Sequence, residues 1–495
     1  MSAAVFLLSA AVLAHEVCLL RVLSLAWWHH AASLVVSVAL LGFGVAGTLL
    51  ALVPGLKRRR TIPVCAGLYA LSIPLSLRAA GGVDFNILEV GWNPSQWLRL
   101  LAVEAIFFLP FVLAAVAILA ALALRSRRPG RVYAANLGGS GAGALLAPPL
   151  LYLAPPAGAL QAAALLAAAA ALTDRRRALR LWGVGAGIAA VALGGRGLPM
   201  SGFKALEQAQ QKTVLDTFIG PLGRVDRVAV PALHYAPGLS LTAPSLPERQ
   251  EALYVDGHLV GARDLVEPSY LDHTVGALPF VLEDSPRTLL LGVGPDLARA
   301  TDVVEINPDL LAASGAGGVA EDPRSFLERT RERYDLIVHH VPTMHAAAVT
   351  PLLTVEGLRA AFERTAPDGG VAVSCDLITP PRAGLKLLAT AERVTPHLIA
   401  VRSLRRLCVW MRRRPPTDAE RARVLQFCDD NGFDPVRPRA WRRAVPHPHT
   451  DTPRGPTSRT GGEHRPPRPD RAFADWMMSV SSAIKGADWR DYYEL

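Results

Sequence analysis

The residues with the clearest chemical potential lie where two apolar runs end. Gly292 and Gly294 follow the run "TLLL", and Glu305 closes the next run, "DVVE". Glycines in such a place allow a tight turn and the close approach of a ligand, and a carboxylate at the end of the second strand can accept hydrogen bonds from both hydroxyls of a ribose. The spacing indicates a nucleoside site, with a glycine turn that binds nothing as the alternative.

Two adjacent histidines mark a third place of this kind. His339 and His340 end the run "YDLIVHH", and an imidazole can act as a general base near neutral pH or bind a metal ion. Neighbouring residues on a strand point to opposite faces, so the two rings are poorly placed to share one ion. We interpret both as candidate catalytic bases, keep ordinary structural histidines as the alternative, and expect no metal.

Alternating patterns must position these residues. Strands are predicted at 288–292, 302–306, 334–339 and 370–375, and helices at 295–301, 323–332, 354–365 and 382–394. This alternation predicts a doubly wound parallel sheet of Rossmann-like type, and short β-like runs in 213–283 predict a small antiparallel subdomain before it. Glu305 follows Gly292 by 13 positions, where about 20 are usual, so we expect a short first helix and a shallow pocket.

The amino-terminal part is too apolar for a soluble protein. Hydrophobic residues make up 51% of the 495 residues, and the excess lies before residue 195. The first apolar stretch carries His15, Glu16 and Arg21 and lacks a basic leader, so we do not expect a cleaved signal peptide. These ionisable groups either pair between helices or bind a polar headgroup. Six stretches approach the roughly 20 residues of a spanning helix and predict six spans: 3–27, 31–54, 61–79, 99–124, 132–154 and 157–173.

Basic loops predict the orientation of these spans. The segments 57–60, 125–131 and 174–180 follow the second, fourth and sixth spans, which places them and the amino terminus in the cytoplasm of an inner-membrane, multi-pass protein. The apolar stretch 181–195 reaches only roughly 22 Å as a helix. We interpret it as interfacial or re-entrant, which puts the soluble part in the cytoplasm. As a seventh span it would put that part outside.

The remaining composition excludes other classes. Much of the net charge of +10 lies in the basic loops and in an Arg- and Pro-rich tail segment, which indicates contact with membrane lipids rather than nucleic acid. The five cysteines are odd in number and contain no CxxC, so we expect reduced thiols rather than a disulfide framework or a thiolate zinc site.

Several segments together resemble one family. "RTLLLGVGPDLARATDVVEINPDLL", "RYDLIVHHVPT" and "FERTAPDGGVAVS" resemble the core of the spermidine synthase-like (polyamine aminopropyltransferase) family, and "ALYVDGHLVGARDLVEPSYLDH" is similar to its amino-terminal β-region. "HEVCLLRVLSL" and "GRVYAANLGGSGAGALLAPPLLYL" are similar to segments of bacterial, membrane-anchored members with a multi-span amino-terminal domain. The resemblance covers about residues 1 to 440.

The resemblance implies an S-adenosylmethionine-dependent methyltransferase fold, with S-adenosylmethionine or its decarboxylated form as cofactor and a small amine as substrate. It assigns cofactor binding to Gly292, Gly294, Asp296, Glu305 and Asp322. It assigns the amine side to Tyr254, Asp256, Tyr270 and Asp272. Structural alternatives exist for three of these residues: Asp256 as part of a hairpin turn, Tyr270 as core, and Asp322 as a helix cap.

The chain departs from the family at two positions. Where the family carries an Asp-Ser/Thr-x-Asp-Pro gate that orients and deprotonates the amine, this sequence reads "HHVPT" from His339. Val260 replaces the usual glutamine and cannot hydrogen-bond a ligand. Two hypotheses therefore remain: a membrane-anchored transferase that modifies a polyamine or other amine, and a catalytically degenerate binding or transport-associated protein that keeps the fold.

These patterns divide the chain into five parts. We predict a transmembrane domain at 1–198, a β-rich subdomain at 199–283, a Rossmann-like domain at 284–433, a disordered linker at 434–471 and a helical segment at 472–495. The last segment resembles one that precedes further chain in longer relatives. Both a single chain and a homodimer stay open.

Overall fold

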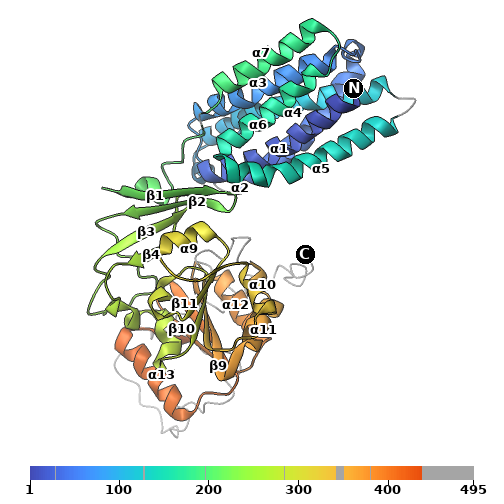
Figure 1. Ribbon diagram of the computed structural model, residues 1–495. Coiled ribbons are helices and arrows are strands. Elements are labelled where there is room, and N and C mark those ends of the chain that lie inside the picture. Colours follow the sequence, from blue (N-terminus) through green and yellow to red (C-terminus); the bar gives the residue numbers. More distant parts are fainter. Residues whose placement is uncertain are drawn as a thin grey trace, which may run out of the picture.

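The computed structural model describes residues 1–27, 29–125, 129–195, 197–283, 285–341, 350–378 and 381–436. The amino-terminal half is a bundle of helices, and the half that follows, made of strands and helices and called the α/β half below, sits at one end of this bundle (Figure 1). Nearly all of the predicted linker and the whole predicted segment 472–495 lie outside the described residues. The linker prediction is wrong at its start, because Asp434–Val436 forms strand β12 at the sheet edge.

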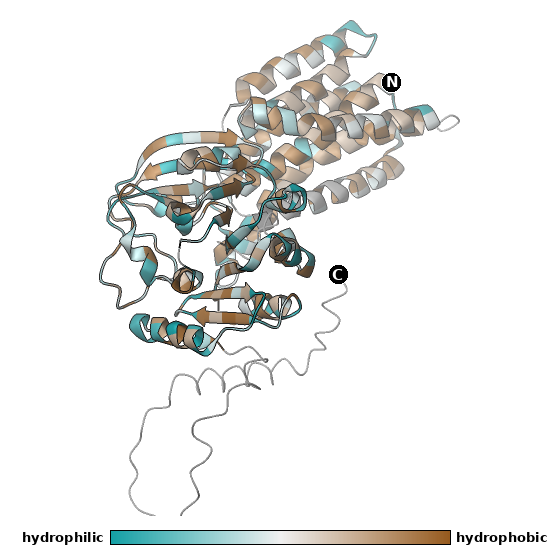
Figure 2. Ribbon diagram, turned by 60° about the horizontal axis from the view of Figure 1, so that its bottom comes forward, coloured by the Kyte–Doolittle hydropathy of each residue, from teal (hydrophilic) through white to brown (hydrophobic). Residues whose placement is uncertain are grey.

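The amino-terminal half is a bundle of long, predominantly apolar helices, coloured mostly brown in Figure 2. Among the described residues, α1 (Ser2–Ala26), α3 (Thr61–Gly81) and α4 (Ser95–Leu124) are long and apolar enough to cross a membrane, and Leu41–Leu52 and Pro156–Leu172 are shorter apolar helices. The helices are α1 (Ser2–Ala26), α2 (His29–Leu52), α3 (Thr61–Gly81), α4 (Ser95–Leu124), α5 (Gly130–Leu153), α6 (Pro156–Leu172) and α7 (Arg177–Leu193).

Small residues bring these helices close together. A Cβ atom on Gly139 of α5 would lie 2.3 Å from the carbonyl oxygen of Phe6 in α1, and one on Gly143 would lie 2.2 Å from that of Ala10. Only glycine permits such an approach of two backbones, and close backbone packing is how helices associate where no water drives them together. The glycine-rich segment "NLGGSGAG" is therefore a packing surface for α1.

The stretch 181–195, for which the sequence predicts an interfacial or re-entrant segment, forms the regular helix α7 as far as Leu193 and packs along α3. Near its start, Trp182 donates a hydrogen bond of 3.4 Å to the carbonyl oxygen of Val64, and at its end the carbonyl oxygen of Leu193 accepts one of 3.0 Å from Arg78. The helix therefore runs along the whole of α3. The helix has 17 residues because it begins at Arg177, four residues before the apolar stretch that starts at residue 181.

The β-rich subdomain is a four-stranded antiparallel sheet in the order β1-β2-β3-β4, which confirms the predicted antiparallel pairing. The short helix α8 (Ala205–Gln208) precedes the sheet. Its strands are β1 (Thr213–Gly220), β2 (Gly223–Ala229), β3 (Gln250–Val255) and β4 (His258–Asp264).

The second sheet has eight strands in the order β12-β10-β11-β9-β8-β5-β6-β7. Strands β5 to β9 are parallel, β11 is antiparallel to both β9 and β10, and β12 is antiparallel to β10. This is a doubly wound sheet of Rossmann-like type, and the order reverses between β5 and β8, where such sheets bind ligands. The strands are β5 (Thr288–Leu291), β6 (Asp302–Glu305), β7 (Val319–Ala320), β8 (Tyr334–Val341), β9 (Thr365–Asp376), β10 (Leu398–Arg402) and β11 (Arg406–Arg412).

The connections between these strands are short. The predicted helix at 295–301 is a single 3₁₀ turn, η5 (Pro295–Arg299), with non-helical dihedral angles at Asp296, because the crossover from β5 to β6 leaves no room for an α-helix. The other connecting elements are η3 (Ser269–His273), η4 (Val275–Val281), α9 (Pro308–Ser314), α10 (Pro323–Arg329), η6 (Thr350–Leu353), α11 (Val355–Glu363), α12 (Arg382–Glu392) and α13 (Asp418–Asn431).

The two halves are joined at the carboxyl end of α1. The amide of Ser201 donates a hydrogen bond of 2.8 Å to the carbonyl oxygen of Ala26. The buried ammonium of Lys204 donates to the carbonyl oxygens of Ser24 at 2.9 Å, Leu25 at 2.7 Å and Asp256 at 2.7 Å. These last carbonyls of α1 have no partner within the helix, so Lys204 satisfies them and ties the β3–β4 turn to α1.

Candidate functional site

The glycine turn that follows β5 is shaped for contacts within the protein. Gly292 has φ +85°, a conformation that favours glycine, and its amide donates a hydrogen bond of 2.8 Å to the carbonyl oxygen of Val304. A Cβ atom on Gly294 would lie 2.9 Å from Cδ2 of His340. The second glycine therefore makes room for an imidazole of the same chain.

The carboxylate of Glu305 lies at the end of β6 and is 7% exposed. Its Oε2 accepts a hydrogen bond of 3.0 Å from the amide of Val293, and its Oε1 accepts one of 2.9 Å from the amide of Asn307. Burial raises the pKa of this carboxyl, against the effect of the backbone hydrogen bonds. Both oxygens thus hold the turns at the ends of β5 and β6.

The closest side-chain pair at these strand ends is Asp296 with His340. Oδ2 of Asp296 lies 2.5 Å from Nε2 of His340, and the two side chains are 1% and 6% exposed. The imidazole lies between Gly294 and Gly276, where an added Cβ atom would be 3.2 Å from Cε1 of His340. The reversal point of the sheet therefore holds a buried acid–base pair.

Three polar atoms around this pair have no hydrogen-bond partner among the described residues. They are Oδ1 of Asp296, Nδ1 of His340 and Nη1 of Arg299, and each is buried. Arg299 Nη1 lies 4.0 Å from Asp296 Oδ1. A buried polar atom without a partner is costly, so the spot is suited to a water molecule or a small polar group.

His339 has a different role from its neighbour. Its Nδ1 lies 2.7 Å from the carbonyl oxygen of Leu291 on β5, directly across the parallel pair. Burial lowers the pKa of His339 to about 4, so the ring is neutral at physiological pH and Nδ1–H donates to that carbonyl. The alternation of strand side chains thus separates the two histidines, and only His340 meets Asp296.

Asp322 caps the helix α10. It is the N-cap residue, and its Oδ2 accepts hydrogen bonds from the amide of Ser325 at 2.8 Å and from the hydroxyl of the same residue at 2.9 Å. The amide of the preceding Glu321 donates to the carbonyl oxygen of Glu305 at 3.1 Å. Asp322 therefore lies next to the end of β6 while its carboxylate serves the cap.

The structure does not bring Tyr254 and Asp256 to the glycine turn. Leu253 packs with Val293 of that turn in one cluster, whereas Tyr254 is 3% exposed and packs on the other face of the sheet with Leu206. Burial raises the pKa of Tyr254. Successive residues of a strand point to opposite faces, so Leu253 faces the glycine turn and its neighbour Tyr254 faces away from it.

Asp256 forms a tight turn and an ion pair. Its φ is +51°, that of Gly257 is +77°, and its carboxylate accepts hydrogen bonds of 2.6 and 2.8 Å from the guanidinium of Arg21 in α1. A third, of 2.9 Å, comes from the amide of Arg224. Asp256 therefore serves the join between the halves.

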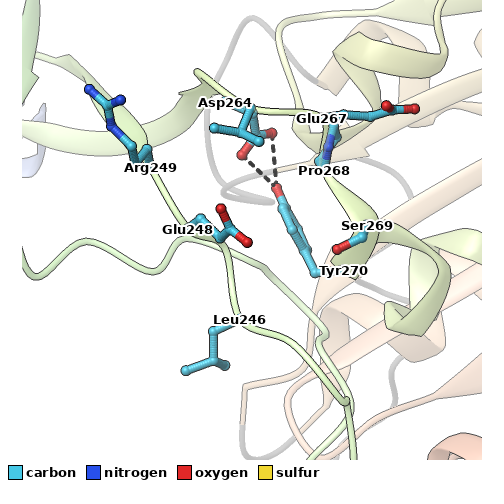
Figure 3. Close-up of a pocket in the computed structure, with 9 residues that line it drawn as sticks. Leu246, Glu248, Arg249, Asp264, Glu267, Pro268, Ser269 and Tyr270 are labelled. Atoms are coloured by element: carbon cyan, nitrogen blue, oxygen red, sulfur yellow. Dashed lines mark hydrogen bonds between the residues drawn. The ribbon is translucent and has the colours of Figure 1, made fainter.

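Tyr270 and Asp272 approach the acid–base pair from η3. The hydroxyl of Tyr270 donates to Asp264 Oδ2 at 3.1 Å, as Figure 3 shows, and receives a bond of 3.2 Å from Gln250. Burial and the neighbouring carboxylate of Asp264 raise the pKa of Tyr270. Asp272 is 77% exposed and forms an ion pair with Arg299. Arg299 thus lies between Asp272 and Asp296.

A pocket opens beside Tyr270 on the β-rich subdomain (Figure 3). Sequence reasoning missed Asp264, which lies in it, as well as Gly276 and Arg299, because none belongs to a recognisable motif. In the described part of the chain, no group of three or more His, Cys, Asp or Glu side chains is arranged to hold a metal ion. The pocket is lined by Leu246, Glu248, Arg249, Asp264, Val266, Glu267, Pro268, Ser269 and Tyr270.

No family model matches the sequence, and no curated protein matches it. Solved structures do. A spermidine synthase in complex with the transition-state analogue AdoDATO is 13% identical, with 42% of this chain and 76% of that chain covered and a TM-score of 0.32. A probable spermidine synthase from Corynebacterium glutamicum ATCC 13032 is 15% identical, with 49% and 100% covered and a TM-score of 0.35. Human methyltransferase-like protein 13 in complex with SAH is 18% identical, with 36% and 94% covered and a TM-score of 0.26.

Proposed function

We propose that this chain is a membrane-anchored binding or transport-associated protein that keeps the methyltransferase fold without its catalysis. The observation that carries this proposal is the position of His340. Its imidazole fills the space between Gly276 and Gly294 and pairs with Asp296 at 2.5 Å. In a fold that binds ligands at the reversal point of its sheet, this ring occupies space that a ligand beside the glycine turn would need.

The other residues implied by the resemblance support the same proposal, because each already has a partner in the protein. Glu305 accepts two backbone hydrogen bonds, Asp322 caps α10, and Asp256 pairs with Arg21. A ribose or an amine would have to share or replace these contacts. Replacing a satisfied, buried hydrogen bond brings little net free energy, so we expect weak affinity for a nucleoside.

A transferase is the second candidate, and the same acid–base pair favours it. A carboxylate that holds one imidazole nitrogen orients the ring and leaves the other nitrogen as a general base. In His340 that second atom is Nδ1, which has no partner among the described residues. On this proposal the cofactor is S-adenosylmethionine or its decarboxylated form, and the acceptor is a polyamine or another small amine.

Calorimetry on the full chain in lipid nanodiscs separates the two candidates. The ligands are S-adenosylmethionine, its decarboxylated form and methylthioadenosine. Because the His340 ring fills the space between Gly276 and Gly294, we expect no binding with a Kd below about 1 mM, which corresponds to about 4 kcal/mol. The variant His340→Ala removes the ring from this space and is expected to bind at least as well as the unaltered chain.

Tight binding to the unaltered chain would overturn the proposal of a degenerate protein. The transferase candidate then makes its own demand: His340→Ala must keep nucleoside affinity and lose turnover with a polyamine acceptor. Glu305→Gln must weaken binding by about ten-fold, the loss of about 1.4 kcal/mol. If His340→Ala lost nucleoside affinity but kept turnover, and Glu305→Gln kept its affinity, His340 would not be the catalytic base.

A further inference from the structure

The helix bundle has two ends, and only one of them contacts the α/β half. We call one the domain end, because Ala26 of α1 contacts Ser201 there and a Cβ atom on Gly81 of α3 would be 3.8 Å from Leu198. The other is the basic end, where the first turns of α3 and α7 meet through Val64 and Trp182. Figure 1 shows the strands and helices of the α/β half beside the domain end and far from the basic end.

The two ends differ sharply in charge. The basic end carries the exposed segment 57–60, Arg125 and Arg131, and the exposed residues 175–177 with Arg180. None of these side chains makes an ion pair with another described residue. At the domain end, the connections 27–29, 81–97 and 154–155 contain no Lys or Arg, and 81–97 contains Asp84 and Glu89. The basic residues in the sequence around this end are fewer and spread out: Arg78 and Arg99 within helices, and Arg196 and Lys204 after α7.

The direction of helix α7 determines at which end of the bundle the α/β half begins. It runs beside α3 from Val64 to Arg78 and packs on α6, where a Cβ atom on Gly183 would be 2.8 Å from that of Ala171. The chain therefore passes from the basic segment 174–180 to the domain end before the α/β half begins. The glycines of α7 allow this close packing and make the seventh pass part of the bundle.

We infer that residues 200–436 lie outside the cytoplasm and that the basic end contacts the anionic headgroups of the cytoplasmic leaflet. Lys and Arg in short loops beside membrane helices are retained on the cytoplasmic side, and their distribution sets the orientation of the whole protein. Anionic lipids of that leaflet attract exposed basic side chains next to the hydrocarbon region. The contrast between the two ends fits one orientation only.

The join between the halves keeps the α/β half at the domain end. The guanidinium of Arg21 is 9% exposed and forms its ion pair with Asp256, and Lys204 holds the end of α1 and the β3–β4 turn at once. These contacts are buried and involve charges that would be left unpaired on separation. The α/β half is therefore fixed to the end opposite the clustered basic segments 57–60 and 174–180.

This orientation is independent of the proposed function, since a glycine turn filled by the His340 ring is compatible with either side of the membrane. The two proposals are nonetheless consistent with each other. A domain outside the cytoplasm is separated from the nucleoside cofactors made inside, so it loses nothing when its own side chain fills the space at the glycine turn.

Cysteine labelling in spheroplasts of a bacterial host tests the orientation. The five native cysteines are all buried, so the unaltered chain gives the background with a membrane-impermeant maleimide. Leu241 is 93% exposed in the α/β half, and Ala178 is exposed at the basic end. We expect Leu241→Cys to react in intact spheroplasts and Ala178→Cys to react only after lysis in detergent.

The reverse pattern would overturn the inference. Leu241→Cys protected until lysis places the α/β half in the cytoplasm, whatever Ala178→Cys does, and lysis in denaturing detergent confirms that the thiol itself is reactive. Nucleoside binding is measured separately by calorimetry. A cytoplasmic domain that binds no nucleoside would thus overturn the orientation alone, and an outward-facing domain that binds one would overturn the proposed function alone.

Discussion

The join between the halves and the glycine turn each contain an acid that the family resemblance assigned to ligand binding. At the join, Asp256 pairs with Arg21, 235 positions away; at the glycine turn, Asp296 pairs with His340, 44 positions away. In both places the base comes from a distant segment. The comparison teaches that a motif identifies where an acid lies but not whether the fold has already given it a partner.

The two pairs differ in how completely they are satisfied. The carboxylate at the join accepts three hydrogen bonds, two from Arg21 and one from the amide of Arg224. Beside the glycine turn, Oδ1 of Asp296 and Nδ1 of His340 have no partner among the described residues. The join is therefore built for stability, whereas the Asp296–His340 pair keeps hydrogen-bonding capacity that a water molecule or a small polar group can use.

The largest effect is expected from breaking the join. Arg21→Ala leaves Asp256 beside the buried Lys204 without its main partner, and removing one member of a buried pair costs about 3–5 kcal/mol. Because the Asp256 side chain is 20% exposed, water restores part of this, and we expect about 2–4 kcal/mol. Unfolding of the full chain by denaturant in detergent measures the loss.

A double-mutant cycle sharpens this result. Asp256→Asn keeps a residue type that tolerates the positive φ of the turn, and it removes the charge that Arg21 meets. The combined change should cost clearly less than the sum of the two single changes. Additive costs would show that Arg21 stabilises α1 by some route other than Asp256.

The second effect concerns Glu305 and depends on pH. Glu305→Gln replaces one of two acceptors by a donor that faces a backbone amide, and leaving such a group unsatisfied costs about 1–3 kcal/mol. Burial raises the folded-state pKa of Glu305 above its ordinary value, so the folded state holds the proton more tightly than the unfolded state. Stability from this group is present at low pH and lost as pH rises through the raised pKa.

The glutamine variant does not titrate at this position. The stability difference between the unaltered chain and Glu305→Gln should therefore be largest below the unfolded carboxyl pKa of about 4.3 and shrink as pH rises above it. Denaturant unfolding at a series of pH values measures this difference. A difference that grew with pH would mean that the backbone hydrogen bonds, rather than burial, dominate the shift in the pKa of Glu305 and keep its carboxyl ionised. A carboxylate that binds a ligand would require this ionised state.

The fold was predictable where periodicity decides it. The apolar runs that became β5, β6 and β8 are buried on both faces, so they had to be parallel strands covered by helices. The 3₁₀ turn η5 was predicted as a helix because an apolar pattern does not report how little space a crossover leaves. Helix α7 was misjudged because its length was counted from apolar residues, whereas Arg177 and Arg180 belong to it.

Only those parts of the site that belong to sequence motifs at strand ends were predictable. Glu305, Gly294 and His340 were found from their places at strand ends, and the structure brings Gly294 and His340 into contact. The pairing of His340 with Asp296 was not foreseen, because it depends on a turn that no local pattern describes. Sequence alone does not fix which side chain of β3 faces the glycine turn, and in the structure Leu253 rather than Tyr254 packs with Val293.

The smallest effect is expected at the solvent-exposed ion pair of Asp272 with Arg299. Asp272 is 77% exposed and its ion pair with Arg299 is open to solvent, so Asp272→Asn should change stability by less than about 0.5 kcal/mol. Arg299 keeps its position over the ring of Phe280, 4.7 Å from the centroid, and stays 4.0 Å from Asp296 Oδ1. The matched change Arg299→Ala removes both contacts together with the guanidinium beside Asp296, so it should cost clearly more. Unfolding of both variants in detergent compares them. If Asp272→Asn proved as costly as Arg299→Ala, then Asp272 would position Arg299 for the buried Asp296–His340 pair and would belong to the charge network of that pair.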